Sequence, residues 1–91
     1  MVLKHASNVP QCALAMEKLM RDAGAPEGVF TNLFVSYEQS DRVIADPRVT
    51  GVTITGSTEV GRGVAATAGQ NLKKIVLELG GSYTMVVLND A

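Results

Sequence analysis

Hydrophobic and polar positions follow a helical period in three segments of the chain and a strand period between them. Apolar residues recur every three or four positions from Val9 to Ala23, after Asn8, which we expect to cap that helix. Two further helices are predicted at residues 36–45, where Ser-x-x-Gln forms a capping box, and at residues 58–70. Runs of β-branched and apolar residues predict strands at residues 2–3, 29–35, 51–55, 74–79 and 84–88.

This order, β-α-β-α-β-α-β-β, predicts an α/β fold of the Rossmann type. Strands that alternate with helices at this spacing are joined by right-handed crossovers and form a mostly parallel sheet. Ligands of such sheets bind beyond the carboxyl ends of the strands. Gly56-Ser57 and the segment 78–81 each leave the carboxyl end of a predicted strand, so we expect a site there.

Composition narrows the class of protein. The 91 residues have room for one domain, and the 46% hydrophobic and 19% charged content suits strands covered on both faces. Eight basic residues against nine acidic ones, without a basic run, indicate no nucleic-acid partner. The apolar runs are too short to cross a bilayer and no signal peptide opens the chain, so we expect no membrane partner and a cytoplasmic location.

The single cysteine and the single histidine offer little chemistry. Neither Cys12 nor His5 has a second ligand at metal-binding spacing, so we expect no metal site. Cys12 stands at an apolar position of the first helix and is predicted to be a buried structural thiol. His5 is predicted to be structural or solvent-facing.

The loop from Gly56 to Gly61 leaves two interpretations open. A strand that ends in Thr-Gly-Ser and enters a helix places backbone N–H groups and the positive helix end at one spot, which suits a phosphate. The alternative is that Ser57 only caps the helix. The loop continues with Arg62-Gly63 and is therefore not a P-loop, and it lacks the third spaced glycine of the dinucleotide fingerprint.

Seven ordered segments resemble segments of the NAD(P)-dependent aldehyde dehydrogenases. Their residues most resemble those of the succinate-semialdehyde dehydrogenases. The segments are Val-Leu-Lys from Val2, Ala-Gly-x-Pro-x-Gly-Val-x-x-x-Leu from Ala23, Asp-Pro-x-Val from Asp46, Thr-Gly-Ser-Thr-Glu-Val-Gly from Thr55, Leu-Lys-Lys from Leu72, Leu-Glu-Leu-Gly-Gly from Leu77 and Val-Leu-x-Asp-Ala from Val87. The resemblance implies that residues 1–91 are a partial NAD(P)-binding domain.

The resemblance also implies which residues bind NAD or NADP: Lys4, Ser7, Thr55, Gly56, Ser57, Val60, Leu79 and Gly80. Ser57 would bind the pyrophosphate, and Val60 would pack near the adenine. Thr55 and the carbonyl group of Leu79 would lie near the nicotinamide, while Lys4 would hydrogen-bond the adenosine ribose.

Ser7 bears on the choice between the two cofactors. Many NAD-preferring members carry a glutamate there, which would repel a 2′-phosphate, whereas serine with Lys4 nearby tolerates one. Serine at this position therefore permits the use of NADP. Ser36-Tyr37 departs from the family, because a glycine-bearing turn is expected at this place.

Glu78 matches the family's general base, which activates water to release the acid product. A carboxylate does this best in a partly apolar site, which the neighbours Leu77 and Leu79 permit. The alternative from the residue alone is an exposed glutamate at a strand end.

The resemblance implies an oxidoreductase that converts an aldehyde, such as succinate semialdehyde, to the acid. The family's nucleophilic cysteine follows well after the Leu-Gly-Gly turn, so we expect the 91 residues alone to be inactive. The rival hypothesis is a truncated remnant that serves as a nucleotide-binding or self-associating domain. In both cases open sheet edges favour a homo-oligomer or aggregation.

Overall fold

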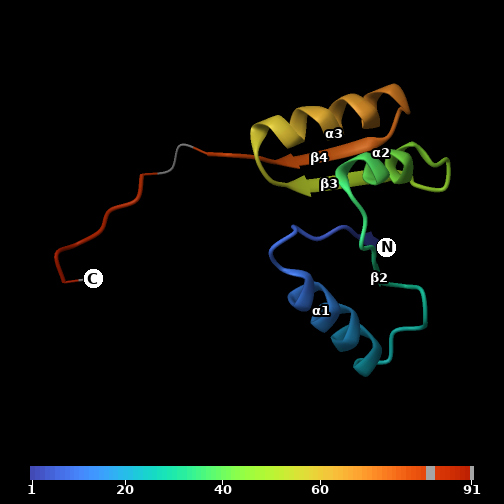
Figure 1. Cartoon of the computed structure of the whole chain (residues 1–91), viewed down its shortest axis with the longest axis horizontal. Coiled ribbons are helices and arrows are strands. Elements are labelled where there is room, and N and C mark those ends of the chain that lie inside the picture. Colours follow the sequence, from blue (N-terminus) through green and yellow to red (C-terminus); the bar gives the residue numbers. More distant parts are fainter. Residues whose placement is uncertain (82–83, 91) are drawn as a thin grey trace. The chain divides into compact units, whose positions relative to one another are not determined.

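The computed structural model describes residues 1–81 and 84–90, so Ala91, the last residue of the final family segment, lies outside the described residues. The chain divides into two compact units, Met1–Ser40 and Asp41–Ala91, each of which is built around one pair of strands. Figure 1 shows the helices α1 (Pro10–Asp22), α2 (Tyr37–Ala45) and α3 (Thr58–Gln70), with the strands β1 (Val2–Leu3), β2 (Thr31–Asn32), β3 (Gly51–Thr55) and β4 (Lys74–Glu78).

In the unit Met1–Ser40, α1 connects two short parallel strands. Val2 of β1 lies opposite Thr31 of β2, and α1 packs against β2 with Ala13 buried. Proline is favoured at the first helical position because its missing N–H would be unpaired there. The helix therefore begins at Pro10 and its cap is Val9, which makes no side-chain cap bond, so the prediction that Asn8 caps it is wrong.

The thiol of Cys12 is also placed differently from the prediction. Cys12 is exposed, because α1 turns its Ala13 side toward β2 and has no second layer to cover its other faces within this unit. The prediction of a buried thiol is therefore wrong.

In the unit Asp41–Ala91, β3 and β4 pair in parallel along their whole length. Gly51 lies opposite Lys74 and Thr55 opposite Glu78, and α3, which connects the two strands, packs against both. Small residues on α3 let the helix approach the strands closely, since Gly61 and Ala68 are buried. The predicted bounds of β3 and α3 are confirmed, and β4 ends one residue early.

The α/β class and the parallel pairing are confirmed, whereas two predicted strands differ. The strand predicted at residues 29–35 shortens to Thr31–Asn32, because the partner β1 has only two residues. Bonds on either side extend the pairing: the N–H of Leu33 donates to the carbonyl of Leu3, the N–H of Thr31 to that of Met1, and the N-terminal ammonium to that of Val29. Residues 84–88 form no strand. A strand needs a neighbouring backbone to pair with, and the described residues provide none for this segment.

Among residues 1–81 and 84–90, no helix has the length and apolar character needed to span a membrane.

Candidate functional site

The carboxyl ends of β3 and β4 bring the two conspicuous motifs of the sequence side by side. Thr55 lies opposite Glu78 in the parallel register. The N–H of Gly56 donates to the carbonyl oxygen of Glu78 at 3.1 Å, so the chain stays paired for one residue beyond β3. The Thr-Gly-Ser turn and the Glu-Leu-Gly segment therefore lie at one edge of this strand pair, as the sequence predicts.

Ser57 caps α3 at this edge. Its backbone is extended, with φ −69° and ψ 155°, and its Oγ accepts a hydrogen bond from the N–H of Val60 at 3.2 Å. The carbonyl oxygen of Ser57 accepts from the N–H of Gly61 at 2.9 Å, which starts the helical ladder. The first N–H groups of a helix have no partner within it, so those of Thr58 and Glu59 are directed out of the helix end beside the strand ends.

Leu79 and Gly80 run alongside the first turns of α3. A Cβ atom added to Gly61 would lie 2.6 Å from Cδ1 and 3.1 Å from Cγ of Leu79, closer than side-chain carbons pack. A Cβ atom on Gly80 would lie 3.8 Å from Oγ1 of Thr58, at ordinary contact distance. Glycine at position 61 therefore makes room for Leu79 and lets the helix start lie against the segment that follows β4.

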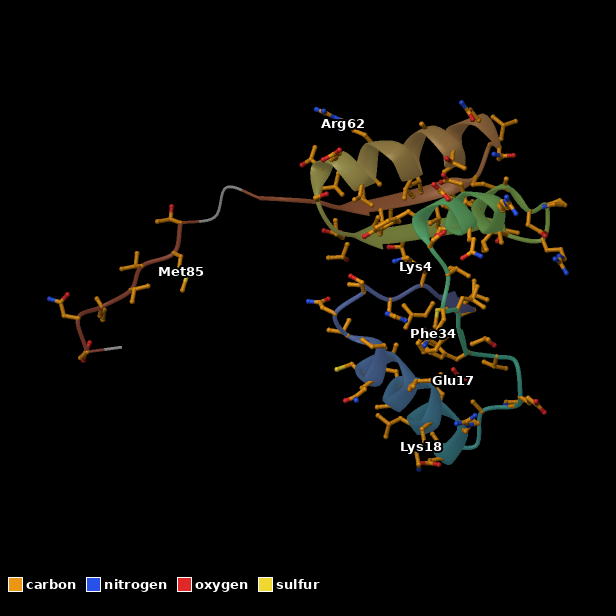
Figure 2. The ribbon with its side chains drawn as sticks, in the orientation of Figure 1. Lys4, Glu17, Lys18, Phe34, Arg62 and Met85 are labelled. Atoms are coloured by element: carbon orange, nitrogen blue, oxygen red, sulfur yellow. The ribbon has the colours of Figure 1, made fainter. Side chains whose placement is uncertain are left out.

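The side chain of Glu78 is exposed at the end of β4, and Leu77 beside it is also exposed. Its carboxylate is open to solvent, while its carbonyl group is used to pair with Gly56. The described residues do not form the apolar surroundings that would suit a general base. Arg62 on α3 points away from β3 and β4 (Figure 2), so its guanidinium does not take the place of a P-loop lysine.

Lys4 and Ser7 belong to the unit Met1–Ser40. The ammonium group of Lys4 donates to the carbonyl oxygen of His5 at 2.9 Å and lies 4.3 Å from the centre of the Tyr37 ring. Ser7 is exposed in the turn before α1. The contact with Tyr37 was not predicted, although the unusual Ser36-Tyr37 pair, in place of a glycine-bearing turn, marked the position.

His5 is held between backbone and an aromatic ring. Its Nδ1 lies 2.7 Å from the carbonyl oxygen of Ala6, and its ring meets that of Phe34 edge to face, with centroids 4.9 Å apart. Figure 2 labels Lys4 and Phe34. Of the two predicted alternatives for His5, structural or solvent-facing, these contacts agree with the structural one.

The structure thus groups most of the predicted site residues at one place. Those of the unit Asp41–Ala91 lie around the ends of β3 and β4 and the start of α3: Thr55, Gly56, Ser57, Val60, Glu78, Leu79 and Gly80. In the described parts of the chain, no three acidic, histidine or cysteine side chains gather as a metal site would require.

Comparison with known proteins identifies relatives along the whole chain. Residues 1–91 match the aldehyde dehydrogenase family. The succinate-semialdehyde dehydrogenase [NADP(+)] of Deinococcus radiodurans is 52% identical over 88 residues, which are 97% of this chain and 18% of that protein. A probable succinate-semialdehyde dehydrogenase [NADP(+)] of Synechocystis is 48% identical over 90 residues, 99% of this chain and 20% of that protein.

Solved structures agree with these relatives. The succinic semialdehyde dehydrogenase from Streptococcus pyogenes, crystallised with NADP+ as the cofactor, is 57% identical and superposes with a TM-score of 0.87 over 89% of this chain and 18% of its own. A structure of Gox0499, from work on its selection of cofactor and substrate, is also 57% identical, with a TM-score of 0.88 over the same shares. The chain therefore spans about a fifth of the length of these relatives.

Proposed function

Because the chain belongs to the aldehyde dehydrogenase family, we propose that it supplies part of the NADP(+)- or NAD-binding domain of an enzyme that oxidises an aldehyde to the acid. Succinate semialdehyde is the proposed substrate, since the relatives from Deinococcus radiodurans, Synechocystis and Streptococcus pyogenes are named for it. The observation that carries the proposal is the junction of β3, β4 and α3, where Gly56 pairs with Glu78 and Ser57 caps the helix.

The junction fits the pyrophosphate of a dinucleotide. Outward N–H groups and the positive end of α3 favour an anion there, and glycine at positions 56 and 80 leaves the backbone accessible. Val60, partly buried in the first turn, offers an apolar contact for the adenine. Glu59 adds a negative charge to the same turn, but its side chain is exposed and free to turn toward solvent.

We propose that NADP is preferred over NAD as the cofactor. Ser7 is neutral, and the ammonium of Lys4 in the same unit supplies the positive charge that a 2′-phosphate requires. The names of both curated relatives and the Streptococcus pyogenes complex specify NADP.

Glu78 is the proposed general base; its match to the family's general-base position supports this role, since the described residues leave its carboxylate exposed. Bound NAD(P)+ supplies the hydride acceptor of the reaction. The exposed carboxylate of Glu78 accepts a proton from the water that releases the acid, and the bond between its carbonyl and Gly56 fixes the strand end that carries it. We propose that the 91 residues alone are inactive, since Cys12, their single thiol, is matched to no catalytic position of the family.

The second candidate is a catalytically inactive remnant that binds nucleotides or associates with itself. It is favoured by the exposed apolar side chains of β4, among them Val76, which is 54% exposed. Weak dinucleotide binding is expected of both candidates, whereas production of NADPH separates them when the chain is joined to a cysteine-containing segment of a relative.

An NMR titration with NADP+, NAD+ and adenosine tests the proposal. The dinucleotides should shift the amide signals of residues 56–61. Their dissociation constants should lie in the high micromolar to millimolar range, which corresponds to a binding free energy of about 4 to 6 kcal/mol. Adenosine, which has no pyrophosphate, should leave the signals of Gly56 and Ser57 in place. If neither dinucleotide moves the signals of residues 56–61, the loop is only a helix cap and the proposal is wrong.

A further inference from the structure

The ammonium group of Lys4 is held by two contacts within the unit Met1–Ser40. One N–H donates to the carbonyl oxygen of His5 at 2.9 Å, and the nitrogen lies 4.3 Å from the centre of the Tyr37 ring. This distance is within the range of a cation–π interaction, in which the negative face of the ring attracts the cation. An ammonium has three N–H donors, so these two contacts leave it a donor for a further partner.

The ring of Tyr37 is set in place by the start of α2. The N–H of Ser36 donates to Oε1 of Gln39 at 2.8 Å, and the N–H of Gln39 donates to Oγ of Ser36 at 3.2 Å. These reciprocal bonds form a capping box that fixes the backbone on both sides of Tyr37. The side chain of Tyr37 is 61% exposed, so burial in the core does not account for a tyrosine at this position.

The carbonyl of His5 is set in place as well. The His5 ring is tied to the carbonyl oxygen of Ala6 and packs edge to face on Phe34. Lys4 therefore lies between two groups that are each ordered by their own neighbours. A long lysine side chain loses much rotamer freedom when it binds a ligand, and prior ordering lowers that cost.

We infer that Tyr37 is a positioning residue for Lys4 and thereby favours a ligand with a 2′-phosphate on its adenosine ribose. This inference rests on the proposed function. The ring and the His5 carbonyl restrict the ammonium, which keeps one N–H donor for a phosphate oxygen. A charge-assisted bond to a doubly charged phosphate is stronger than a bond to a neutral hydroxyl, so ordering of Lys4 affects NADP+ more than NAD+.

The inference is tested by measuring the dissociation constants for NADP+ and NAD+ of the parent 91-residue chain and of two Tyr37 variants. Tyr37→Leu removes the ring, and Tyr37→Phe retains it and serves as the matched control. We expect Tyr37→Leu to weaken NADP+ binding about two- to fivefold, the range that a cation–π contact at an exposed site supports. NAD+ binding should weaken less, and Tyr37→Phe should bind both ligands as the parent does.

Two readouts separate positioning from a general structural effect. The ε-CH₂ protons of Lys4 should show an upfield ring-current shift in the parent and in Tyr37→Phe that is lost in Tyr37→Leu, while the amide signals of residues 38–45 stay in place. In a Lys4→Met background, Tyr37→Leu should cause no further loss of NADP+ affinity, because the cation that the ring holds is gone.

The same measurements separate the role of Tyr37 from the proposed binding of NADP+ and NAD+. If the parent binds NADP+ and Tyr37→Leu binds it equally well, the inference is wrong and the proposed function stands. An equal loss with and without Lys4 also overturns the inference. If the parent binds neither dinucleotide, both are overturned.

Discussion

Single atoms decide how closely α3 approaches the segment after β4. Gly61 is buried against Leu79, and the space where its Cβ would lie is filled by the leucine side chain. Gly63, two residues along the same helix, has no neighbour within 4 Å of an added Cβ. The surroundings of the two glycines therefore differ, although only one residue separates them in the sequence.

Gly61→Ala should be less stable than Gly63→Ala by about 1 to 3 kcal/mol, the usual cost of overpacking. Both variants gain about 1 kcal/mol of helix propensity, but only alanine at position 61 displaces Leu79. Urea unfolding of the two variants measures the difference. In a Leu79→Ala background the two substitutions should become equivalent, and a difference that persists there would contradict the contact.

Ser57 combines two roles that substitution can separate. Ser57→Ala should lower the stability by about 1 kcal/mol through loss of the cap bond to the N–H of Val60, and it should weaken NADP+ binding. Ser57→Asp should retain the cap and the stability, yet repel the pyrophosphate and abolish the shifts at residues 56–61. Thermal unfolding and NMR titration of both variants test this. NADP+ binding by Ser57→Asp at the parent's affinity would refute the assigned role.

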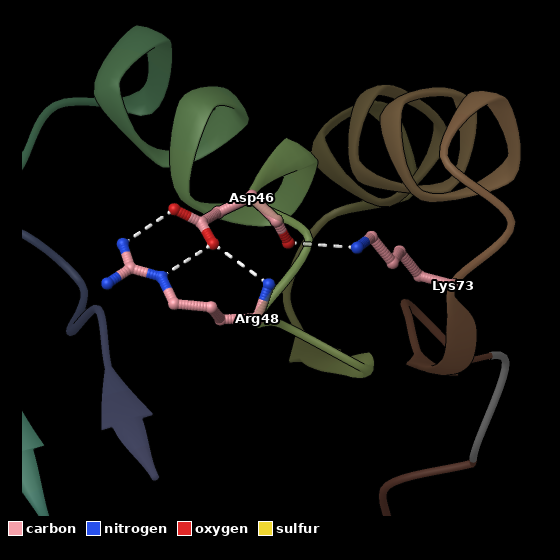
Figure 3. Close-up of polar contacts among 3 residues, drawn as sticks. All are labelled: Asp46, Arg48 and Lys73. Carbon is pink, nitrogen blue, oxygen red and sulfur yellow. Dashed lines mark hydrogen bonds and ion pairs between the residues drawn. The ribbon is translucent and has the colours of Figure 1, made fainter.

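Among the elements, the turn between α2 and β3 is tied to the start of β4 (Figure 3). The backbone N–H of Arg48 donates to Oδ1 of Asp46 at 2.9 Å, and its guanidinium donates to both carboxylate oxygens at 2.9 and 2.7 Å. Nζ of Lys73 donates to the backbone carbonyl oxygen of Asp46 at 2.9 Å. Residues that precede two paired strands are thus joined by one aspartate.

This turn should make stability depend on pH in the acid range. The side-chain hydrogen bonds from Arg48, then its backbone N–H, hold the pKa of Asp46 well below its ordinary value of 3.8. A lowered folded-state pKa stabilises the fold above the ordinary value, and this contribution is lost as the pH falls below about 3.8. Asp46→Asn should be less stable than the parent at pH 6, and the difference should narrow at pH 2.5.

Thermal unfolding of parent and Asp46→Asn at both pH values measures this effect. The exposed Arg48 carries the counter-charge, so Arg48→Gln should remove most of the same pH dependence. A constant difference between parent and Asp46→Asn from pH 6 to pH 2.5 would show that the carboxylate's charge is not what holds the turn.

In the molecule as a whole, apolar surface remains uncovered on β4 and on residues 84–88. Ile75, Val76 and Leu77 are all exposed, and Met85 is 85% exposed. Within the described residues, β3 is the single strand that pairs with β4. A strand with an open edge and exposed apolar side chains is a template for pairing with another chain.

The purified 91-residue chain should therefore associate as its concentration rises, which sedimentation velocity measures. Val76→Lys should reduce the association, because a charge on the strand opposes pairing. Leu72→Lys is the control, since Leu72 is exposed in the turn before β4 and adds the same charge outside the strand. A monomer at all concentrations, or equal effects of both variants, would contradict association through β4.

Local rules determine a large part of this fold. The bounds of α3 and β3 follow from the cap at Ser57 and from a β-branched run, and the parallel pairing follows from the alternation of strands and helices. The candidate site at the strand ends was predicted for the same reason, since Gly56 follows β3 and Glu78 ends β4 in one parallel pair. Capping, periodicity and chain alternation act over a few residues, so the sequence displays them directly.

Only the tertiary structure decides which side chains meet and which segments find a partner. The contact of Gly61 with Leu79 and that of Lys4 with Tyr37 join residues far apart in the chain, and no local pattern encodes their distance. The exposure of Cys12 and the absence of a strand at residues 84–88 have the same origin. An apolar residue is buried, and a strand forms, only where another element lies against it, because burial and backbone pairing both require a neighbour.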